Sequence, residues 1–397
     1  MTLIITPSKL TGAITPPPSK SQAHRFLIAA ALAGKGSAVH NLAQSEDIRA
    51  TQRCLEEIGP WNGPMSPLRR IALPHLDCGE SGSTLRFLIP IALAVRGGGL
   101  FTGRGRLMER PQKPYFDLFD EKGVSYVQKD GVLTVQGLLT PGEYRLPGNV
   151  SSQFITGLLY ALPLLEGDSK IMLTTALESR GYVDMTLEAL EAFGIQVTWA
   201  DERTLLVPGG QSYSPKDVTV EADWSQAGFW YAAKGLGNPV EIQGMDPHSK
   251  QGDQIIEEYY VKLCGEGTVT LDVSQCPDLV PALAAHAALR QGQITHIVNA
   301  ERLRIKESDR LSSVREELCK LGGQVTETPD SLTITGVERL TGGSVDAHND
   351  HRIAMMLAIA STRAEGPVTL TGAESVNKSY PNFWEDYVNL SGQIAPL

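Results

Sequence analysis

The sequence predicts an α/β protein built from six copies of one unit, three in each half of the chain. Each copy has a polar or charged turn, a run of about fourteen small and apolar residues, a glycine and a short β-branched stretch. Self-similarity of this kind fixes the architecture before any single motif does. The copies begin at Pro18, Gly79, Gly148, Ala222, Ser274 and Ala347. Units of about sixty to seventy residues give the helices room to be enclosed by sheet.

The apolar runs predict six buried helices, because each run is too long for a strand and is rich in Ala and Leu. Each run follows a turn that carries Ser, Asp or Asn, and each ends near a glycine. In chain order the runs are FLIAAALAGKG, FLIPIALAVRG, FITGLLYALPLLEG, GFWYAAKGLG, VPALAAHAALRQG and IAMMLAIASTRAEG. A helix N-terminus presents unpaired N–H groups and a partial positive charge, so several such ends brought together favour anions.

Longer amphipathic stretches lie between the copies. Residues 184–193 and 312–321 have helical periodicity, and each is followed by an alternating, strand-like segment. A chain of 397 residues exceeds what one core usually supports. We therefore expect two domains, each with three repeats.

Composition narrows the class of function. Lys and Arg number 35 against 45 Asp and Glu, a net charge of −10 that disfavours a nucleic-acid-binding surface. The five cysteines have no C-x-x-C spacing and are expected to be reduced thiols of a cytosolic protein. The N-terminus has no basic region, and charges or glycines interrupt the apolar runs. We expect neither export nor membrane insertion.

Motifs for a nucleotide or a metal are missing from the sequence. There is no G-x-x-x-x-G-K-[ST], and Gly103 and Gly105 lack the third glycine of a dinucleotide loop. His348 and His351 have no cysteine or carboxylate at ligand spacing, so a hydrogen-bonding role at a helix start is favoured over a metal site. We predict no metal and no cofactor.

The turns and short polar motifs collect basic residues instead. One such residue alone is usually a solvated surface charge. Together, at equivalent ends of repeated helices, they predict a cleft for a ligand with more than one phosphate or carboxylate group. They are Lys20, Arg25, Arg86, Arg110, Arg180, Lys306, Arg310, Arg352 and Lys378.

Two carboxylates stand among these cations, at Asp278 and Glu307. A general base or acid would be placed in such surroundings. The alternatives are structural: Asp278 as an N-cap of the fifth helix, and Glu307 as an ion-pair partner of Arg310. Spacing alone leaves both open.

Seven motifs in order resemble the 5-enolpyruvylshikimate-3-phosphate synthase family: P-S-K-S-Q-A-H-R, C-G-E-S-G-S-T-L-R, E-R-P, N-V-S-S-Q-F, R-I-K-E-S-D-R, N-D-H-R-I-A-M and N-K-S-Y-P. The resemblance implies transfer of the enolpyruvyl group of phosphoenolpyruvate to the 5-hydroxyl of shikimate 3-phosphate, with release of phosphate. It implies two inside-out α/β domains of three repeats, each with buried helices surrounded by sheet. It places residues 1–14 and 223–397 in one domain and residues 15–222 in the other, closing around substrate as a monomer.

The resemblance also implies residue roles. For shikimate 3-phosphate the matching residues are Lys20, Ser21, Arg25, Ser151, Ser152, Gln153, Ser179, Tyr182, Asp278 and Lys306. For phosphoenolpyruvate they are Lys20, Gly82, Arg110, Gln153, Arg310, Arg352 and Lys378, with the inhibitor glyphosate expected against Gly82. The catalytic residues are Asp278, which takes the 5-hydroxyl proton, and Lys20 and Glu307, which move a proton at C3.

Some positions depart from the family pattern. Glu80 replaces a common Asn beside the phosphoenolpyruvate site and adds a negative charge, which makes a partner such as Arg86 important. His24 and Phe87 replace the commoner Asn and Pro, and Arg302 stands where some members have Asn.

Three other functions remain as alternatives. A UDP-N-acetylglucosamine enolpyruvyl transferase has the same fold, but residues 103–111 lack its reactive loop cysteine. A non-catalytic phosphometabolite-binding protein would explain the cations and leave Asp278 and Glu307 structural. An RNA 3′-phosphate cyclase would need a nucleotide-handling histidine and a less acidic surface.

Overall fold

The computed structural model describes residues 1–60 and 72–397. The chain forms two compact units, residues 1–19 with 221–397 and residues 20–220. The expected boundaries, at 14/15 and 222/223, lie within a few residues of these. That each unit is a domain in its own right stays a prediction.

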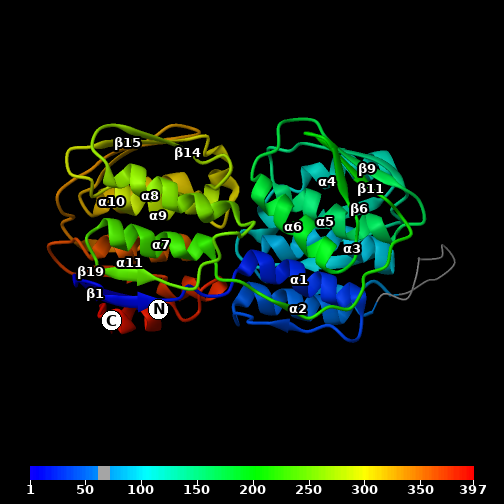
Figure 1. Cartoon of the computed structure of the whole chain (residues 1–397), viewed down its shortest axis with the longest axis horizontal. Helices are drawn as coiled ribbons and strands as arrows, with labels where there is room; N and C mark the ends of the chain where they lie inside the picture. The colour runs from blue at the N-terminus through cyan, green and yellow to red at the C-terminus, as the bar shows by residue number, and fades with distance from the viewer. Residues whose placement is uncertain (61–71) are drawn as a thin grey trace. The chain divides into compact units, whose positions relative to one another are not determined.

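The unit of residues 20–220 has helices that pack against sheets (Figure 1). Its helices are α1 (Lys20–Ala33), α2 (Glu46–Ile58), α3 (Gly82–Arg96), α4 (Lys113–Lys122), α5 (Ser152–Ala161) and α6 (Arg180–Ala192). Its strands are β3 (Val39–His40), β4 (His75–Asp77), β5 (Gly98–Thr102), β6 (Ser125–Lys129), β7 (Val132–Gln136), β8 (Gly142–Leu146), β9 (Ser169–Leu173), β10 (Thr198–Asp201), β11 (Thr204–Val207) and β12 (Val218–Thr219). Helices α3 and α5 are buried at most of their residues.

The other unit repeats this arrangement. Its helices are α7 (Trp224–Gly235), α8 (Ile256–Cys264), α9 (Val280–Ala287), α10 (Arg310–Lys320), α11 (His351–Ser361) and α12 (Phe383–Asn389). Its strands are β1 (Thr2–Thr6), β2 (Gly12–Ile14), β13 (Val240–Ile242), β14 (Val269–Asp272), β15 (Ile294–Val298), β16 (Gln324–Glu327), β17 (Leu332–Thr335), β18 (Gly343–Asp346), β19 (Val368–Thr371) and β20 (Gln393–Pro396).

The four-stranded sheets share one topology. Their orders are β4-β5-β7-β6, β8-β9-β11-β10, β14-β15-β17-β16 and β18-β19-β1-β20. In each, the first pair is parallel and the next two are antiparallel. The buried helices α3, α5, α9 and α11 are the crossovers between the parallel strands. Strand β1 completes the last sheet from the far end of the chain.

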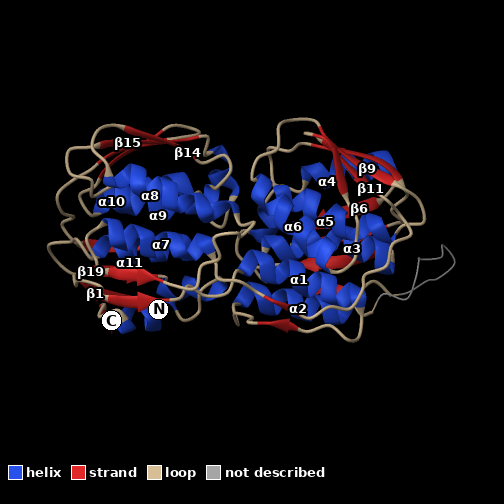
Figure 2. Cartoon of the chain, viewed as in Figure 1, coloured by secondary structure: helices blue, strands red, loops and turns tan. Residues whose placement is uncertain are grey.

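Helices enclosed by sheet are visible in one unit in Figure 2, where α7 to α11 lie between the strands β1 and β19 and the strands β14 and β15. Helix α11 is buried at all its residues, and α3 at most of its residues. Each unit has its own apolar core. The predicted α/β fold of repeated units, with buried helices surrounded by sheet, is therefore confirmed.

The helix ends differ in part from the expectation. Gly97, with φ of +71°, caps α3 in the left-handed conformation, as a C-terminal glycine should. Helix α5 stops at Ala161 and passes into a 3₁₀ turn containing Pro163. Helices α9 and α11 also end before their glycines, so those glycines lie in the turns beyond.

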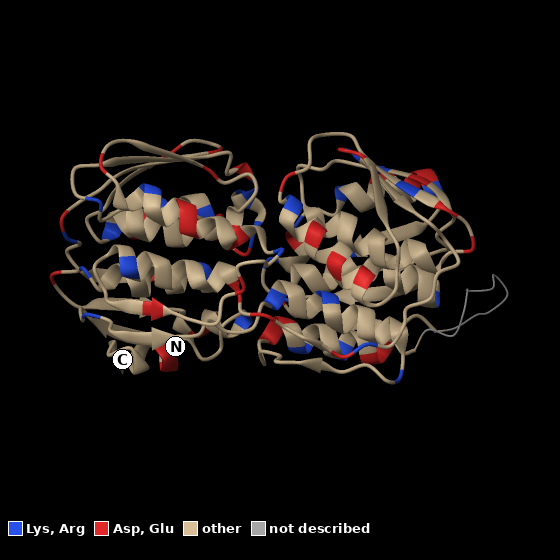
Figure 3. Cartoon of the chain, viewed as in Figure 1, with Lys and Arg blue, Asp and Glu red and all other residues tan. Residues whose placement is uncertain are grey.

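Charge and hydropathy agree with the composition. Figure 3 shows both Lys or Arg and Asp or Glu on each unit. Among the described residues, no helix combines the length and apolar character that a bilayer span needs.

Candidate active site

Side chains of the polar turns cap α3, α5, α7 and α11, as their sequences predict. At α9 the N-cap position is Leu279, so the N-cap interpretation of Asp278 is wrong. Ser81 accepts from the Thr84 N–H at the start of α3, and Ser151 from the Gln153 N–H at the start of α5. Asp350 accepts from the Arg352 N–H at the start of α11. Capping residues satisfy only part of a helix's free N–H groups, so these ends keep donors for an anion.

In the unit of residues 20–220, Lys20 opens α1. Its ammonium lies 2.7 Å from the Asp47 carboxylate of α2, and both side chains are mostly buried. Lys20 is therefore held at the start of α1 by a carboxylate of the neighbouring helix.

Arg25 lies deeper on α1 and is buried. Its guanidinium donates to the Ser21 carbonyl at 2.7 Å, the Tyr182 carbonyl at 2.7 Å and the Thr186 hydroxyl at 2.9 Å. Burial lowers the pKa of Arg25 to about 10. Arg25 thus joins α1 to α6, and its role toward shikimate 3-phosphate stays a prediction.

Gly82 is the first residue of α3 and lies against Arg110. A Cβ on Gly82 would stand 2.7 Å from an Arg110 guanidinium nitrogen. Gly82 is not among the residues with positive φ, so its backbone conformation does not require a glycine. Its missing side chain makes room for Arg110.

Glu80 lies next to this turn. A Cβ built on Gly105 would be 2.6 Å from the Glu80 carboxylate, so Glu80 packs against the loop that follows β5.

The guanidinium of Arg86 donates to Gln153 Oε1 at 2.8 Å and to the Pro111 carbonyl at 3.1 Å. Arg86 therefore orients Gln153.

Gln153 is fixed at both ends of its amide. Besides accepting from Arg86, its Nε2 donates to Ser83 at 3.0 Å. Ser152 is buried beside it, in the first turn of α5.

Ser179 lies at the start of α6 and has a φ of +56°, in the left-handed region. A non-glycine residue in that region is uncommon and is often found at a functional turn.

In the other unit, Asp278 lies in the 3₁₀ turn Pro277–Leu279 immediately before α9. Its carboxylate accepts from Arg310 at 2.9 Å, Arg352 at 3.2 Å and Lys306 at 3.4 Å. Arg352 also donates to the Asp278 carbonyl at 3.1 Å. Asp278 is thus the point where three predicted site cations meet.

Arg310 is the most buried of these cations, with 1% of its side chain exposed. Besides Asp278, it contacts Glu307 at 2.6 Å and Asp350 at 2.8 Å. The ion-pair interpretation of Glu307 is therefore confirmed, and it does not conflict with a proton-transfer role. Three carboxylates, those of Asp278, Glu307 and Asp350, already contact these cations. An incoming anion therefore competes with the carboxylates for the cations.

Lys306 and Lys378 border this cluster. Burial lowers the pKa of Lys306 to about 8, although Asp278 acts in the opposite direction. Lys378 donates to the Asn349 carbonyl in the turn before α11. Arg302 donates to the Ser274 carbonyl. The predicted side chains of this unit thus surround the starts of α9 and α11.

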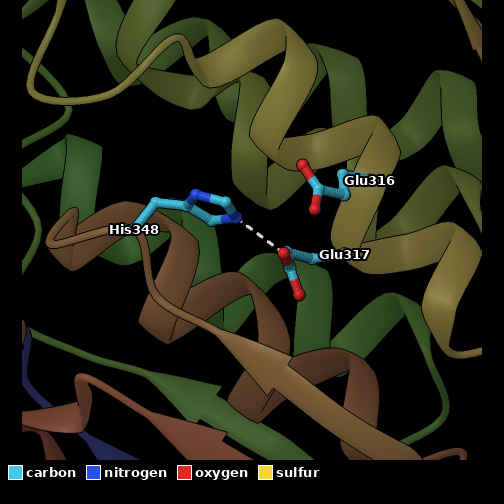
Figure 4. A group of neighbouring side chains, drawn as sticks. All are labelled: Glu316, Glu317 and His348. Atoms are coloured by element: carbon cyan, nitrogen blue, oxygen red, sulfur yellow. Dashed lines mark hydrogen bonds and ion pairs between the residues drawn. The ribbon is translucent and has the colours of Figure 1, made fainter.

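His348 lies in a different group, with Glu316 and Glu317 (Figure 4). Its Nε2 is 2.6 Å from Glu317, and the Lys320 ammonium is 2.8 Å from Glu317 and 3.1 Å from Glu316. The sequence shows no carboxylate at ligand spacing to His348, but the fold brings Glu316 and Glu317 beside it. The Lys320 ammonium is therefore an ion-pair partner of both carboxylates.

The chain matches known proteins over almost its whole length. Residues 4–387 match the family model of EPSP synthase (3-phosphoshikimate 1-carboxyvinyltransferase). The chain belongs to the EPSP synthase family. It is 45% identical to the 3-phosphoshikimate 1-carboxyvinyltransferase of Clostridium perfringens (strain SM101 / Type A), over 98% of each chain. It is 46% identical to the Clostridium kluyveri enzyme of the same name, over 98% of this chain and 97% of the relative.

Solved structures show the same fold. EPSP synthase from Acinetobacter baumannii has a TM-score of 0.79 at 24% identity, with complete coverage of both chains. The enolpyruvyl transferase NikO from Streptomyces tendae has a TM-score of 0.76 at 18% identity, over 99% of this chain and 98% of NikO. The family match and the curated relatives identify the chain as a transferase.

Sequence reasoning missed two carboxylates, Asp47 and Asp350. Asp47 pairs with Lys20 from a neighbouring helix, a contact that no local pattern shows. Asp350 is signalled by its place before the sixth apolar run, which is typical of an N-cap, but not as a partner of Arg310.

Proposed function

We propose that this chain transfers the enolpyruvyl group of phosphoenolpyruvate to the 5-hydroxyl of shikimate 3-phosphate, giving 5-enolpyruvylshikimate 3-phosphate and phosphate. The match to the family over residues 4–387 supports this proposal most strongly. The meeting of Lys306, Arg310 and Arg352 on Asp278 supports it independently. A base held among cations suits an alcohol that attacks an anionic substrate.

The proposed mechanism is addition followed by elimination. Asp278 takes the 5-hydroxyl proton as that oxygen bonds to C2 of phosphoenolpyruvate, while Lys20 or Glu307 donates a proton to C3. The resulting tetrahedral ketal phosphate loses phosphate as the same group removes a C3 proton. Lys20 suits the donor step because Asp47 holds its ammonium at the start of α1.

We assign the anion contacts by their chemistry. Arg110, Arg310 and Arg352 present planar guanidinium forks, which fit phosphate and carboxylate groups. Lys378 and Gln153 complete the proposed phosphoenolpyruvate contacts. The proposed shikimate 3-phosphate contacts are Lys20, Ser21, Arg25, Ser151, Ser152, Gln153, Ser179, Tyr182, Asp278 and Lys306.

We also propose that the enzyme works as a cytosolic monomer and that glyphosate competes with phosphoenolpyruvate beside Gly82. The five cysteines are all free thiols, which suits a reducing compartment. Sedimentation of the purified chain measures its oligomeric state, and inhibition kinetics measure the competition.

Phosphate release separates the proposed reaction from its nearest rival. The assay supplies phosphoenolpyruvate with either shikimate 3-phosphate or UDP-N-acetylglucosamine. We expect release only with shikimate 3-phosphate. Release only with the nucleotide sugar would assign the rival activity, and release with neither would leave a binding protein.

A further inference from the structure

A chain of buried hydrogen bonds joins the starts of α1, α2 and α3. His24 Nδ1 lies 2.7 Å from the Thr51 hydroxyl, which lies 2.7 Å from the Thr84 hydroxyl. Thr84 in turn donates to the Ser81 hydroxyl at 2.7 Å. All four side chains have 0% exposure. We call His24, Thr51, Thr84 and Ser81 the buried relay.

The relay runs parallel to the ion pair of Lys20. On α1, His24 follows Lys20 by four residues, and on α2, Thr51 follows Asp47 by four. Residues four apart lie above one another on a helix. The Lys20–Asp47 ion pair and the His24–Thr51 hydrogen bond are therefore two successive contacts, one helical turn apart, between α1 and α2.

The hydrogen bonds have one direction. Each hydroxyl has a single proton to donate. Because the Thr84 hydroxyl donates its proton to Ser81, it must accept a hydrogen bond from the Thr51 hydroxyl. The Thr51 hydroxyl must then accept from His24 Nδ1. The proton of the neutral imidazole therefore sits on Nδ1.

The rest of the imidazole agrees with this tautomer. Among the described residues, His24 Nε2 is buried without a hydrogen-bond partner. A bare ring nitrogen tolerates that position better than an N–H would. Burial, and then the charges of Lys20 and Arg25, lower the pKa of His24 well below its usual value. A second proton on the ring is thus disfavoured.

We propose that His24, as the neutral Nδ1–H tautomer, is a positioning residue that fixes the first turn of α3 against α1 through Thr51 and Thr84. Ser81 caps α3 and directly precedes Gly82, the proposed phosphoenolpyruvate contact. The relay therefore sets where Gly82 and Arg110 lie relative to Lys20. This role rests on the proposed function, whereas the tautomer does not.

The tautomer is measured directly by long-range ¹H–¹⁵N NMR of the histidine-labelled full chain, with His24 assigned by the signal lost in His24→Asn. We expect a protonated Nδ1 and a bare Nε2, unchanged between about pH 5 and about pH 8. A protonated Nε2, or a ring that titrates in this range, would overturn the relay.

The positioning role is measured with Thr51→Val, which removes the hydroxyl and keeps the shape. We expect the KM for phosphoenolpyruvate to rise on the order of tenfold, with kcat and the KM for shikimate 3-phosphate within about threefold. Thr51→Ser should restore the wild-type KM.

Thr295→Val is the matched control, because Thr295 is equally buried and accepts from Arg290 in the other unit. It should lower Tm without changing either KM. A wild-type KM in Thr51→Val, or equal KM changes in both variants, would overturn the positioning role. If Thr51→Val does not fold, Thr51→Ser and the NMR measurement still decide, since a raised KM in the serine variant contradicts rescue.

Discussion

At the residue scale, Lys306 carries a pH dependence. Burial lowers its pKa to about 8, so the unliganded side chain loses its charge as pH rises through that value. A neutral amine attracts the anionic substrate less. We predict that the KM for shikimate 3-phosphate is lowest below about pH 8 and rises above it. Bound anion raises the pKa again, so kcat should change at a higher pH than KM does.

Lys306→Arg is the control for this prediction, because arginine stays charged over the whole range. Its KM profile should be flat where the wild-type KM rises. Steady-state kinetics from about pH 6 to about pH 10 make the comparison. A wild-type KM that stays level through pH 8 would show that Lys306 does not titrate there.

Gly82 carries a second prediction. A methyl group at this position meets the Arg110 guanidinium at 2.7 Å, so Gly82→Ala must displace that flexible side chain. A clash between the new methyl group and the longer inhibitor glyphosate would cost about 1–3 kcal/mol of binding free energy. We predict weaker phosphoenolpyruvate binding, a larger loss for the longer inhibitor glyphosate, and a Tm close to wild type. Equal losses for both ligands with a clearly lowered Tm would point to damage to the fold.

The sequence predicted these residues but not their partners. Asp278 and Glu307 could be picked out because they interrupt a series of cations along the chain. Their ion pairs with Arg310 and the pairing of Lys20 with Asp47 join separate helices. Such contacts depend on tertiary packing, which no local pattern contains.

At the scale of elements, the start of α11 holds the cation cluster together. Asp350 has 0% exposure, caps α11, and accepts from Ser308 and twice from Arg310. Removing one partner of a buried pair costs about 3–5 kcal/mol. Asp350→Asn keeps a capping oxygen and loses the charge, so we predict a destabilisation of that size.

Asp223→Asn is the matched control, because Asp223 caps α7 in the same way through the Gln226 N–H. Because Asn caps a helix about as well as Asp does, Asp223→Asn should cost less than about 1 kcal/mol. Denaturant unfolding of both variants gives the comparison. Similar small losses would mean that Asp350 acts as a cap only.

Helices were easier to predict than their ends and their neighbours. A long run rich in Ala and Leu identifies α3 or α11 without any tertiary information. The end of α5 depends on Pro163, which the apolar pattern hides. The place of β1 between β19 and β20 joins the two ends of the chain, and only the family resemblance suggested it.

At the scale of the whole molecule, both units present charged side chains at the starts of repeated helices. In the proposed mechanism, these fixed side chains carry out the chemistry. We therefore predict that chelator-treated enzyme keeps its kcat. Among the described residues, Glu316, Glu317 and His348 form a group that could hold a divalent cation, and Lys320 already pairs with both carboxylates. Activity lost to chelator and restored only by a divalent metal would contradict this.

The central claim is that Asp278 accepts a proton during transfer and is more than a counter-ion for its three cations. The most direct measurement is kcat for Asp278→Asn, together with the Kd for shikimate 3-phosphate. Asn removes the proton acceptor and one negative charge among Lys306, Arg310 and Arg352, so substrate binding should be unchanged or tighter. We predict a kcat lower by about 10²–10⁴. A kcat near wild type would contradict it and leave Asp278 a structural ion-pair partner.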